Sequence, residues 1–67
     1  MSTVKVIELL AESEKGWEDA AQIAVSKAGE SLHGIKSVYI KEMEAKVEGN
    51  KITAYRINAK VSFALDE

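Results

Sequence analysis

Apolar and polar residues divide the chain into segments with different periods. Residues 3–11 are rich in β-branched and aliphatic side chains, which favours a strand with both faces partly apolar. The polar stretch 12–16 follows and is expected to form a turn. Residues 17–33 then repeat small and aliphatic side chains at helical spacing. The members of this stripe are Ala21, Ala24, Ala28 and Leu32, with Ala20 and Val25 beside them. The pattern predicts a strand, a turn and a helix.

The ends of the predicted helix carry recognisable signals. Gly16 can act as the N-cap, and Glu18 and Asp19 lie in the first turn, where the helix dipole favours acids. Gly34 is expected to follow the helix in the left-handed conformation. Because the apolar stripe is mostly alanine, we expect the helix to pack closely against a sheet.

The second half of the chain predicts a long hairpin, with strands over 35–48 and 51–65 joined at Gly49-Asn50. The last strand alternates clearly. One side carries Tyr55, Ile57, Ala59, Val61, Phe63 and Leu65, and the other carries Arg56, Asn58, Lys60 and Ser62. These alternating faces predict a sheet that buries one side.

A two-residue loop also predicts the register of this hairpin. Far from the turn, Val38 is expected opposite Val61 and Ile40 opposite Ala59. Nearer the turn, the expected pairs lie on the other face, and they are Met43 with Arg56, Ala45 with Ala54 and Val47 with Ile52. The apolar side would then change over along the hairpin. We expect the base to pack under the chain's own helix and the tip to pack on neighbouring subunits.

The predicted fold class is α+β, in the order β-α-β-β, as one domain over residues 1–67. The three-stranded antiparallel sheet would wrap around the single helix, with the first strand beside the last. A helix over 17–33 is roughly 26 Å long at ~1.5 Å per residue, whereas strands of about 14 residues reach ~46 Å. One helix therefore cannot cover such a sheet.

The size of the chain strengthens the case for partners. At 67 residues it is marginal as an isolated domain, and it has no cysteine for disulfides and one histidine, His33. Self-association remains as the source of stability. The formal net charge of −2 and the lack of a basic cluster argue against nucleic acid as a partner. No long apolar run indicates a membrane span, and no signal-peptide pattern opens the chain, so we expect a cytoplasmic location.

The order strand, helix, long hairpin resembles the dodecin family. The resemblance rests on K-V-I-E at 5–8, S-E-K-G-W-E-D-A at 13–20 and Y-R-I-N-A-K-V-S-F at 55–63. It implies a homododecamer with a hollow interior lined by sheets and with helices outside. Flavin-binding members hold FMN or riboflavin on a tryptophan and a glutamine. Their positions fall here on Ser37 and Arg56, and Glu44 stands where an arginine would meet a nucleotide phosphate.

These departures bear directly on the ligand. Stacking on an aromatic ring contributes ~1–3 kcal/mol, and serine supplies none of it, so flavin binding would weaken by about one to two orders of magnitude. Arg56 can still donate hydrogen bonds to a flavin edge. The tryptophan-less pattern with Tyr-Arg-Ile also resembles calcium dodecins. Oxygen ligands for Ca²⁺ or Mg²⁺ would come first from Glu42 and Glu44, with Glu48, Asp66 and Glu67 as further acids.

The sequence therefore predicts a binding protein and not an enzyme. A shell that sequesters a small, flavin-type ligand through Ser37, Arg56 and Glu44 is the first interpretation. A flavin-free assembly, purely structural or cation-binding, is the alternative. Trp17 is interpreted as a packing residue at the helix start or a subunit contact, and His33 lacks the partner residues of a catalytic site.

Overall fold

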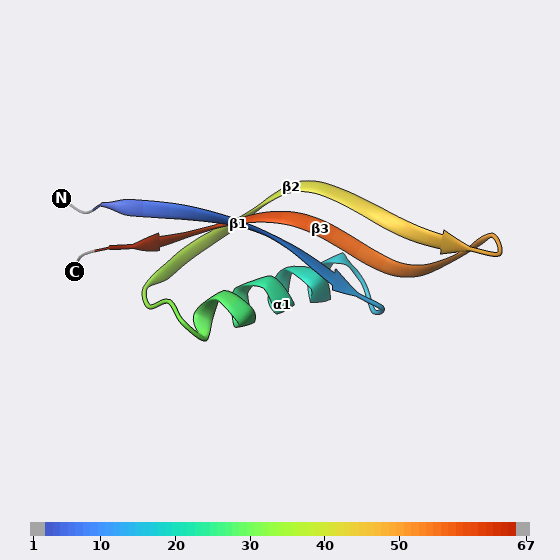
Figure 1. Ribbon diagram of the computed structural model, residues 1–67, viewed down its shortest axis with the longest axis horizontal. Helices are drawn as coiled ribbons and strands as arrows, with labels where there is room; N and C mark the ends of the chain where they lie inside the picture. Colours follow the sequence, from blue (N-terminus) through green and yellow to red (C-terminus); the bar gives the residue numbers. More distant parts are fainter. Residues whose placement is uncertain (1–2, 66–67) are drawn as a thin grey trace.

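The computed structural model of the protein describes residues 3–65 as one helix on a three-stranded sheet. The elements are β1 (Val4–Ser13), α1 (Trp17–Gly29), β2 (Ile35–Glu48) and β3 (Lys51–Ala64). The strand order is β1-β3-β2 with both pairings antiparallel. The predicted β-α-β-β arrangement, with the first strand beside the last, is confirmed. The helix lies along one side of the sheet, and the β2–β3 hairpin extends well past it (Figure 1).

The first strand runs two residues further than the polar pattern predicted. Glu12 and Ser13 were expected in a turn, yet they pair with Arg56 and Tyr55 of β3. Ser13 is buried, and its Oγ donates to Asp19 Oδ2 at 2.6 Å while accepting from the Lys15 amide at 2.9 Å. A polar residue thus extends the strand because its hydroxyl finds partners in the turn and in the helix.

Helix α1 begins as predicted and ends earlier than predicted. Gly16 is the N-cap, but the helix stops at Gly29 and not at residue 33. After Ala28 the backbone hydrogen bonds change to the i→i−3 pattern of a 3₁₀ turn. The amides of Glu30 and Ser31 each donate to the carbonyl three residues earlier, at 3.2 Å. Glycine is a poor helix former, which favours an end at this point. Gly34 has the predicted positive φ of 74°, but it leads into β2, and its carbonyl accepts from the Ala64 amide at 3.0 Å.

The core is thin and built from small side chains. Ala20 and Ala24 of the helix are fully buried, and they contact a cluster that includes Ala11, Ile57 and Ala59 of the sheet. Trp17 packs at the edge of this cluster, edge-on to Tyr55 with ring centroids 4.9 Å apart. The expected close approach of an alanine face and the packing role of Trp17 are confirmed.

The hairpin turn forms as predicted, with φ of 59° at Gly49 and 64° at Asn50. Positive φ at both residues is what a type I′ two-residue loop requires. The pairs Val38–Val61, Ile40–Ala59 and Val47–Ile52 are confirmed.

Between these pairs the predicted register is wrong by one residue. Met43 lies opposite Ile57 and Ala45 opposite Tyr55, because Lys41 on β2 and Thr53 on β3 are extra residues at two bulges. The predicted changeover of the apolar side therefore does not occur, and the side chains that pair with Ile57 and Tyr55 remain on the helix side.

The hairpin tip lies beyond the chain's own core. The chain measures 51 × 19 × 13 Å, whereas 13 helical residues span only ~20 Å. Met43, Val47 and Ile52 are each more than half exposed. Within residues 3–65, the helix is neither long nor apolar enough to cross a membrane.

Candidate functional site

The candidate site lies on the side of the sheet that faces away from the helix, which we call the open face. Strand alternation places the buried Ile57, Ala59 and Val61 against the helix, so their neighbours on β3 point the other way. The register aligns the open face in rows across β1, β3 and β2. These rows are Val6–Ser62–Ser37, Glu8–Lys60–Tyr39, Leu10–Asn58–Glu42 and Glu12–Arg56–Glu44. The predicted residues Ser37, Glu42, Glu44 and Arg56 therefore share one face.

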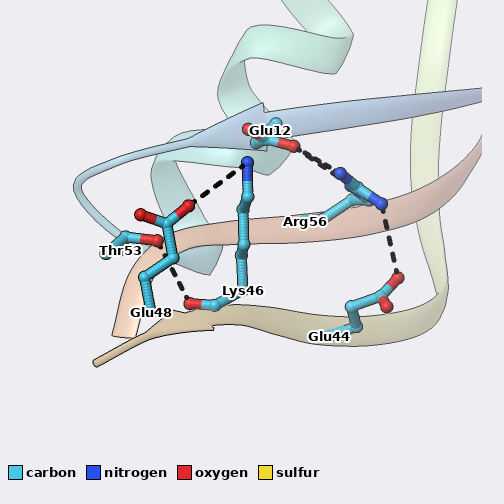
Figure 2. A network of polar contacts seen from close by, with 6 residues as sticks. All are labelled: Glu12, Glu44, Lys46, Glu48, Thr53 and Arg56. Carbon is cyan, nitrogen blue, oxygen red and sulfur yellow. Dashed lines mark hydrogen bonds and ion pairs between the residues drawn. The ribbon is translucent and has the colours of Figure 1, made fainter. Parts of the chain in front are cut away.

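Arg56 is held between carboxylates from the two outer strands. Its Nε and Nη2 donate to Glu12 Oε1 at 3.0 and 2.9 Å, and its Nη1 lies 3.9 Å from Glu44 Oε1 (Figure 2). The Arg56 and Glu12 side chains are 44% and 45% exposed, so each contact is worth little as an isolated ion pair. Arg56 therefore pairs with Glu44 on one side and with Glu12 on the other, and no contact joins it to Glu42 among the ion pairs of residues 3–65.

Sequence reasoning missed Glu12 because it placed this residue in a turn. A signal for it was available, since the first strand was expected beside the last. Continuing that antiparallel strand by two residues brings Glu12 opposite Arg56. The guanidinium is consequently positioned from both edges of the sheet, and fewer of its donors remain for a ligand.

Ser37 lies three rows from Arg56, and its hydroxyl is bonded to a neighbouring side chain. Its Oγ and that of Ser62 are 2.6 Å apart and share a hydrogen bond. Ser37 has no aromatic ring on which a flavin could stack, and Arg56 already donates hydrogen bonds to Glu12. These two residues therefore do not fit the flavin site that the family resemblance implied. The aromatic side chain closest in register is Tyr39, which is 64% exposed and pairs with Lys60.

Glu42 and Glu44 meet at a small hollow of about 30 Å³ on the open face. Leu10, Arg56, Ile57 and Asn58 complete its lining. Asn58 Oδ1 is buried and has no hydrogen-bond partner. Three carboxylates, those of Glu12, Glu42 and Glu44, lie around the single guanidinium of Arg56. These four groups carry a net charge of −2. An open hollow of about 270 Å³ lined by Glu44, Lys46 and Arg56 adjoins this region.

This donor set fits a hard divalent cation better than it fits a flavin. Carboxylate and amide oxygens are the ligands that Ca²⁺ and Mg²⁺ prefer. An amide oxygen left without a donor beside two carboxylates is the arrangement that such an ion would satisfy. Within residues 3–65, no three His, Cys, Asp or Glu side chains gather into a metal-binding group. Asp66 and Glu67, which the sequence also offered, lie outside the described residues.

Two further ion pairs extend the charged surface. Lys41, the extra residue of its bulge, places Nζ 3.6 Å from Glu8 Oε2 on β1. Near the tip, Lys46 Nζ lies 3.9 Å from Glu48 Oε2, and its carbonyl accepts from Thr53 Oγ1 at 3.4 Å (Figure 2). Glu48 is thus paired at the tip, away from Glu42 and Glu44.

The start of the helix presents a separate hollow of about 450 Å³, lined by Trp17, Met43 and the turn before the helix. Trp17 Nε1 is buried there without a hydrogen-bond partner. Glu18 and Asp19 also line this hollow, and their charges disfavour an anion. None of the predicted ligand residues lies in it.

Comparison with known proteins gives a consistent result. The sequence model of the Dodecin family matches residues 3–66. The calcium dodecin of Mycobacterium tuberculosis is 35% identical over 65 residues, which is 97% of this chain and 92% of that protein.

Solved structures agree on the fold. A crystal structure of the M. tuberculosis calcium dodecin, with a novel calcium-binding site, is 36% identical and has a TM-score of 0.81, covering 97% of this chain and 93% of that chain. A mutant dodecin from Thermus thermophilus is 28% identical and has a TM-score of 0.92, with 100% of both chains covered.

Proposed function

Because the chain belongs to the dodecin family, we propose that it is a subunit of a hollow homododecamer that sequesters a divalent cation, Ca²⁺ or Mg²⁺, on the open face of its sheet. This is binding rather than catalysis. The observation that carries the proposal is the excess of acid around Arg56, where three carboxylates surround one guanidinium.

Self-association is supported by the apolar surface that one chain leaves uncovered. Val4, Val6 and Leu10 are more than half exposed on the open face, and the hairpin tip adds Val47 and Ile52. Monomeric proteins rarely expose so much aliphatic surface for their size. A chain of 67 residues also gains the stability it lacks alone when copies cover these surfaces.

Cation binding is supported by the chemistry of Glu42 and Glu44. Both lie on the open face and line one hollow, and Glu44 has only a long contact of 3.9 Å with Arg56. Similarity to a calcium dodecin over 97% of the chain favours the same class of ligand. The role of these residues would be to hold the ion and to neutralise its charge inside the shell.

A flavin-type ligand is the second candidate, and one observation favours it. Tyr39 is 64% exposed in the row next to Ser37, and it offers the ring that Ser37 does not. Arg56 would donate to the edge of such a ligand, and Glu44 would repel a phosphate. Riboflavin should therefore bind more tightly than FMN.

Native mass spectrometry of the EDTA-treated protein tests both candidates. We expect a twelve-fold mass that gains calcium or magnesium on addition of the ion. The double variant Glu42→Gln/Glu44→Gln should still form the twelve-fold assembly but should no longer gain the ion. Glu48→Gln is the matched control, because it removes an acid of the same strand that is paired at the tip.

The other outcomes are equally informative. Retention of riboflavin with no cation would replace the first candidate by the second. A monomer or dimer at micromolar concentration would contradict the shell itself.

A further inference from the structure

The corner between the start of helix α1 and the projecting hairpin is hollow. The β2–β3 ladder continues past the helix start as a two-stranded ribbon that the helix does not cover (Figure 1). Where the ribbon leaves the helix, Trp17, Met43 and the turn before the helix line a hollow of about 450 Å³. This volume is far larger than one water molecule needs, so side chains of a partner can enter it.

The apolar lining of this hollow continues along the ribbon. Met43 pairs with Ile57, and further along the ladder Val47 pairs with Ile52 on the same side of the sheet. Met43, Val47 and Ile52 are each more than half exposed. One chain therefore carries a largely uncovered apolar strip that runs from the helix start to the hairpin tip.

The two ends of this strip carry opposite charges. The hollow has a net charge of −1, from Lys15, Glu18 and Asp19. The tip has a net charge of +1, from Lys46, Glu48 and Lys51. Within residues 3–65, the side chains of Glu18 and Lys51 take part in no ion pair. An unpaired acid at one end and an unpaired base at the other make the two ends complementary.

The tip cannot reach the hollow of its own chain. Trp17 packs on Tyr55 with ring centroids 4.9 Å apart, and Lys51 lies four residues further along β3. Four strand residues span ~13 Å. The ladder pairs continue to Glu48 with Lys51, which holds the tip away from the helix. A tip that enters the hollow must therefore come from another chain.

We propose that the hollow at the helix start is a docking site for the hairpin tip of a second copy of this chain. Val47 and Ile52 of that copy cover Trp17 and Met43, and its tip charge lies against the acids of the hollow. The contact is apolar at its centre and charged at its rim, as specific interfaces are. This inference rests on the self-association proposed above and names the two surfaces that meet.

Disulfide trapping tests the contact directly, because the chain has no cysteine of its own. We expect Glu18→Cys/Lys51→Cys to give covalent multimers on a non-reducing gel after mild oxidation. When reduced, this variant should keep the native mass of the unmodified protein. A bridge within one chain is excluded by the spacing along β3, since bonded cysteines have Cα atoms within ~7 Å.

The matched control is Glu30→Cys/Lys51→Cys. Glu30 follows the last residue of the same helix, and its side chain is 67% exposed. This variant carries the same tip cysteine but has its second cysteine outside the hollow, so we expect it to remain a single chain on the gel.

Charge reversal gives an independent measurement. Glu18→Lys and Lys51→Glu should each raise the subunit concentration at which the assembly dissociates, about two- to fivefold, because like charges then meet. The exchange variant Glu18→Lys/Lys51→Glu should restore the original value. A loss caused only by a base at the helix start would persist in the exchange variant. Analytical ultracentrifugation over a dilution series measures these values.

The outcomes separate this contact from the assembly on which it rests. A twelve-fold native mass with no covalent product from Glu18→Cys/Lys51→Cys overturns the docking and leaves the shell standing, as does equal cross-linking in the control. A monomer in the native mass of the unmodified protein overturns both. If the cysteine variant does not fold, the exchange variant decides, because failure to restore the assembly there contradicts the contact.

Discussion

Replacement of Ile57 tests the packing on which the open face depends. Ile57 is 1% exposed, lies on β3 between Ala11 and Met43, and is one of the two largest fully buried side chains among residues 3–65. Ile57→Ala removes three carbon atoms, or ~2.4 kcal/mol at ~0.8 kcal/mol for each buried methylene. The remaining cavity adds to this, so we expect a loss of about 3–4 kcal/mol, within the usual range for such changes. Ile57→Val should cost about 1 kcal/mol.

Urea unfolding followed by Trp17 fluorescence measures these differences. The probe is well placed, since Trp17 packs on Tyr55, two residues from the substitution. All variants must be compared at one subunit concentration, because dissociation and unfolding are linked in an oligomer. A domain of this length has roughly 3–10 kcal/mol of stability, so Ile57→Ala should lose a large fraction of it.

The matched control is Ile23→Ala on the outer side of the helix, where the side chain is 41% exposed. We expect this change to cost well under half as much as Ile57→Ala. Equal losses for the two alanine variants would refute the reasoning, because they would mean that the alanine-rich contact between helix and sheet is not where the stability arises.

Three further predictions have defined outcomes, the first with a matched control. Gly49→Ala should destabilise the protein by about 1–2 kcal/mol in thermal or urea unfolding, because φ is 59° there, whereas Gly16→Ala, in open space at an extended φ of 162°, should be nearly neutral. Ser13→Ala should cost about 1–3 kcal/mol, since it leaves the buried end of β1 without the bonds to Asp19 and the Lys15 amide; a stability equal to the unmodified protein would contradict this. Arg56→Ala should change stability by less than about 1 kcal/mol, because its ion pairs are nearly half exposed, while the affinity for Ca²⁺ measured by calorimetry should rise as a positive charge leaves the site.

The sequence predicted correctly the features that depend on residues close together in the chain. Gly49-Asn50 specifies its turn through positive φ, and the alternation from Tyr55 to Phe63 specifies which side of β3 is buried. The end of the helix was predicted too late because Leu32 continues the apolar stripe in sequence. In the structure the chain leaves the helix at Gly29 to reach β2.

The sequence predicted some residues of the candidate site and missed others. Arg56 and Glu44 were both expected to be site residues, but the register predicted from the turn placed Met43 opposite Arg56, and it is the bulge at Lys41 that brings Glu44 beside the guanidinium. Glu12 and Asn58 were missed because their roles depend on pairing across the sheet and on burial by neighbours from other strands. The one-residue error in register between Met43 and Ala45 arose from bulges, which leave no clear mark in the alternation of a strand that is charged on both sides.

The bulges at Lys41 and Thr53 have a consequence for how this sheet can vary in length. A single-residue deletion inside a strand normally turns every later side chain to the opposite face. Here each bulge holds one residue outside the ladder, so deleting Lys41 or Thr53 would remove that bulge and keep Glu42, Glu44, Arg56 and Asn58 on the open face. These are two places where the protein can lose a residue from a β-strand and keep its acidic surface.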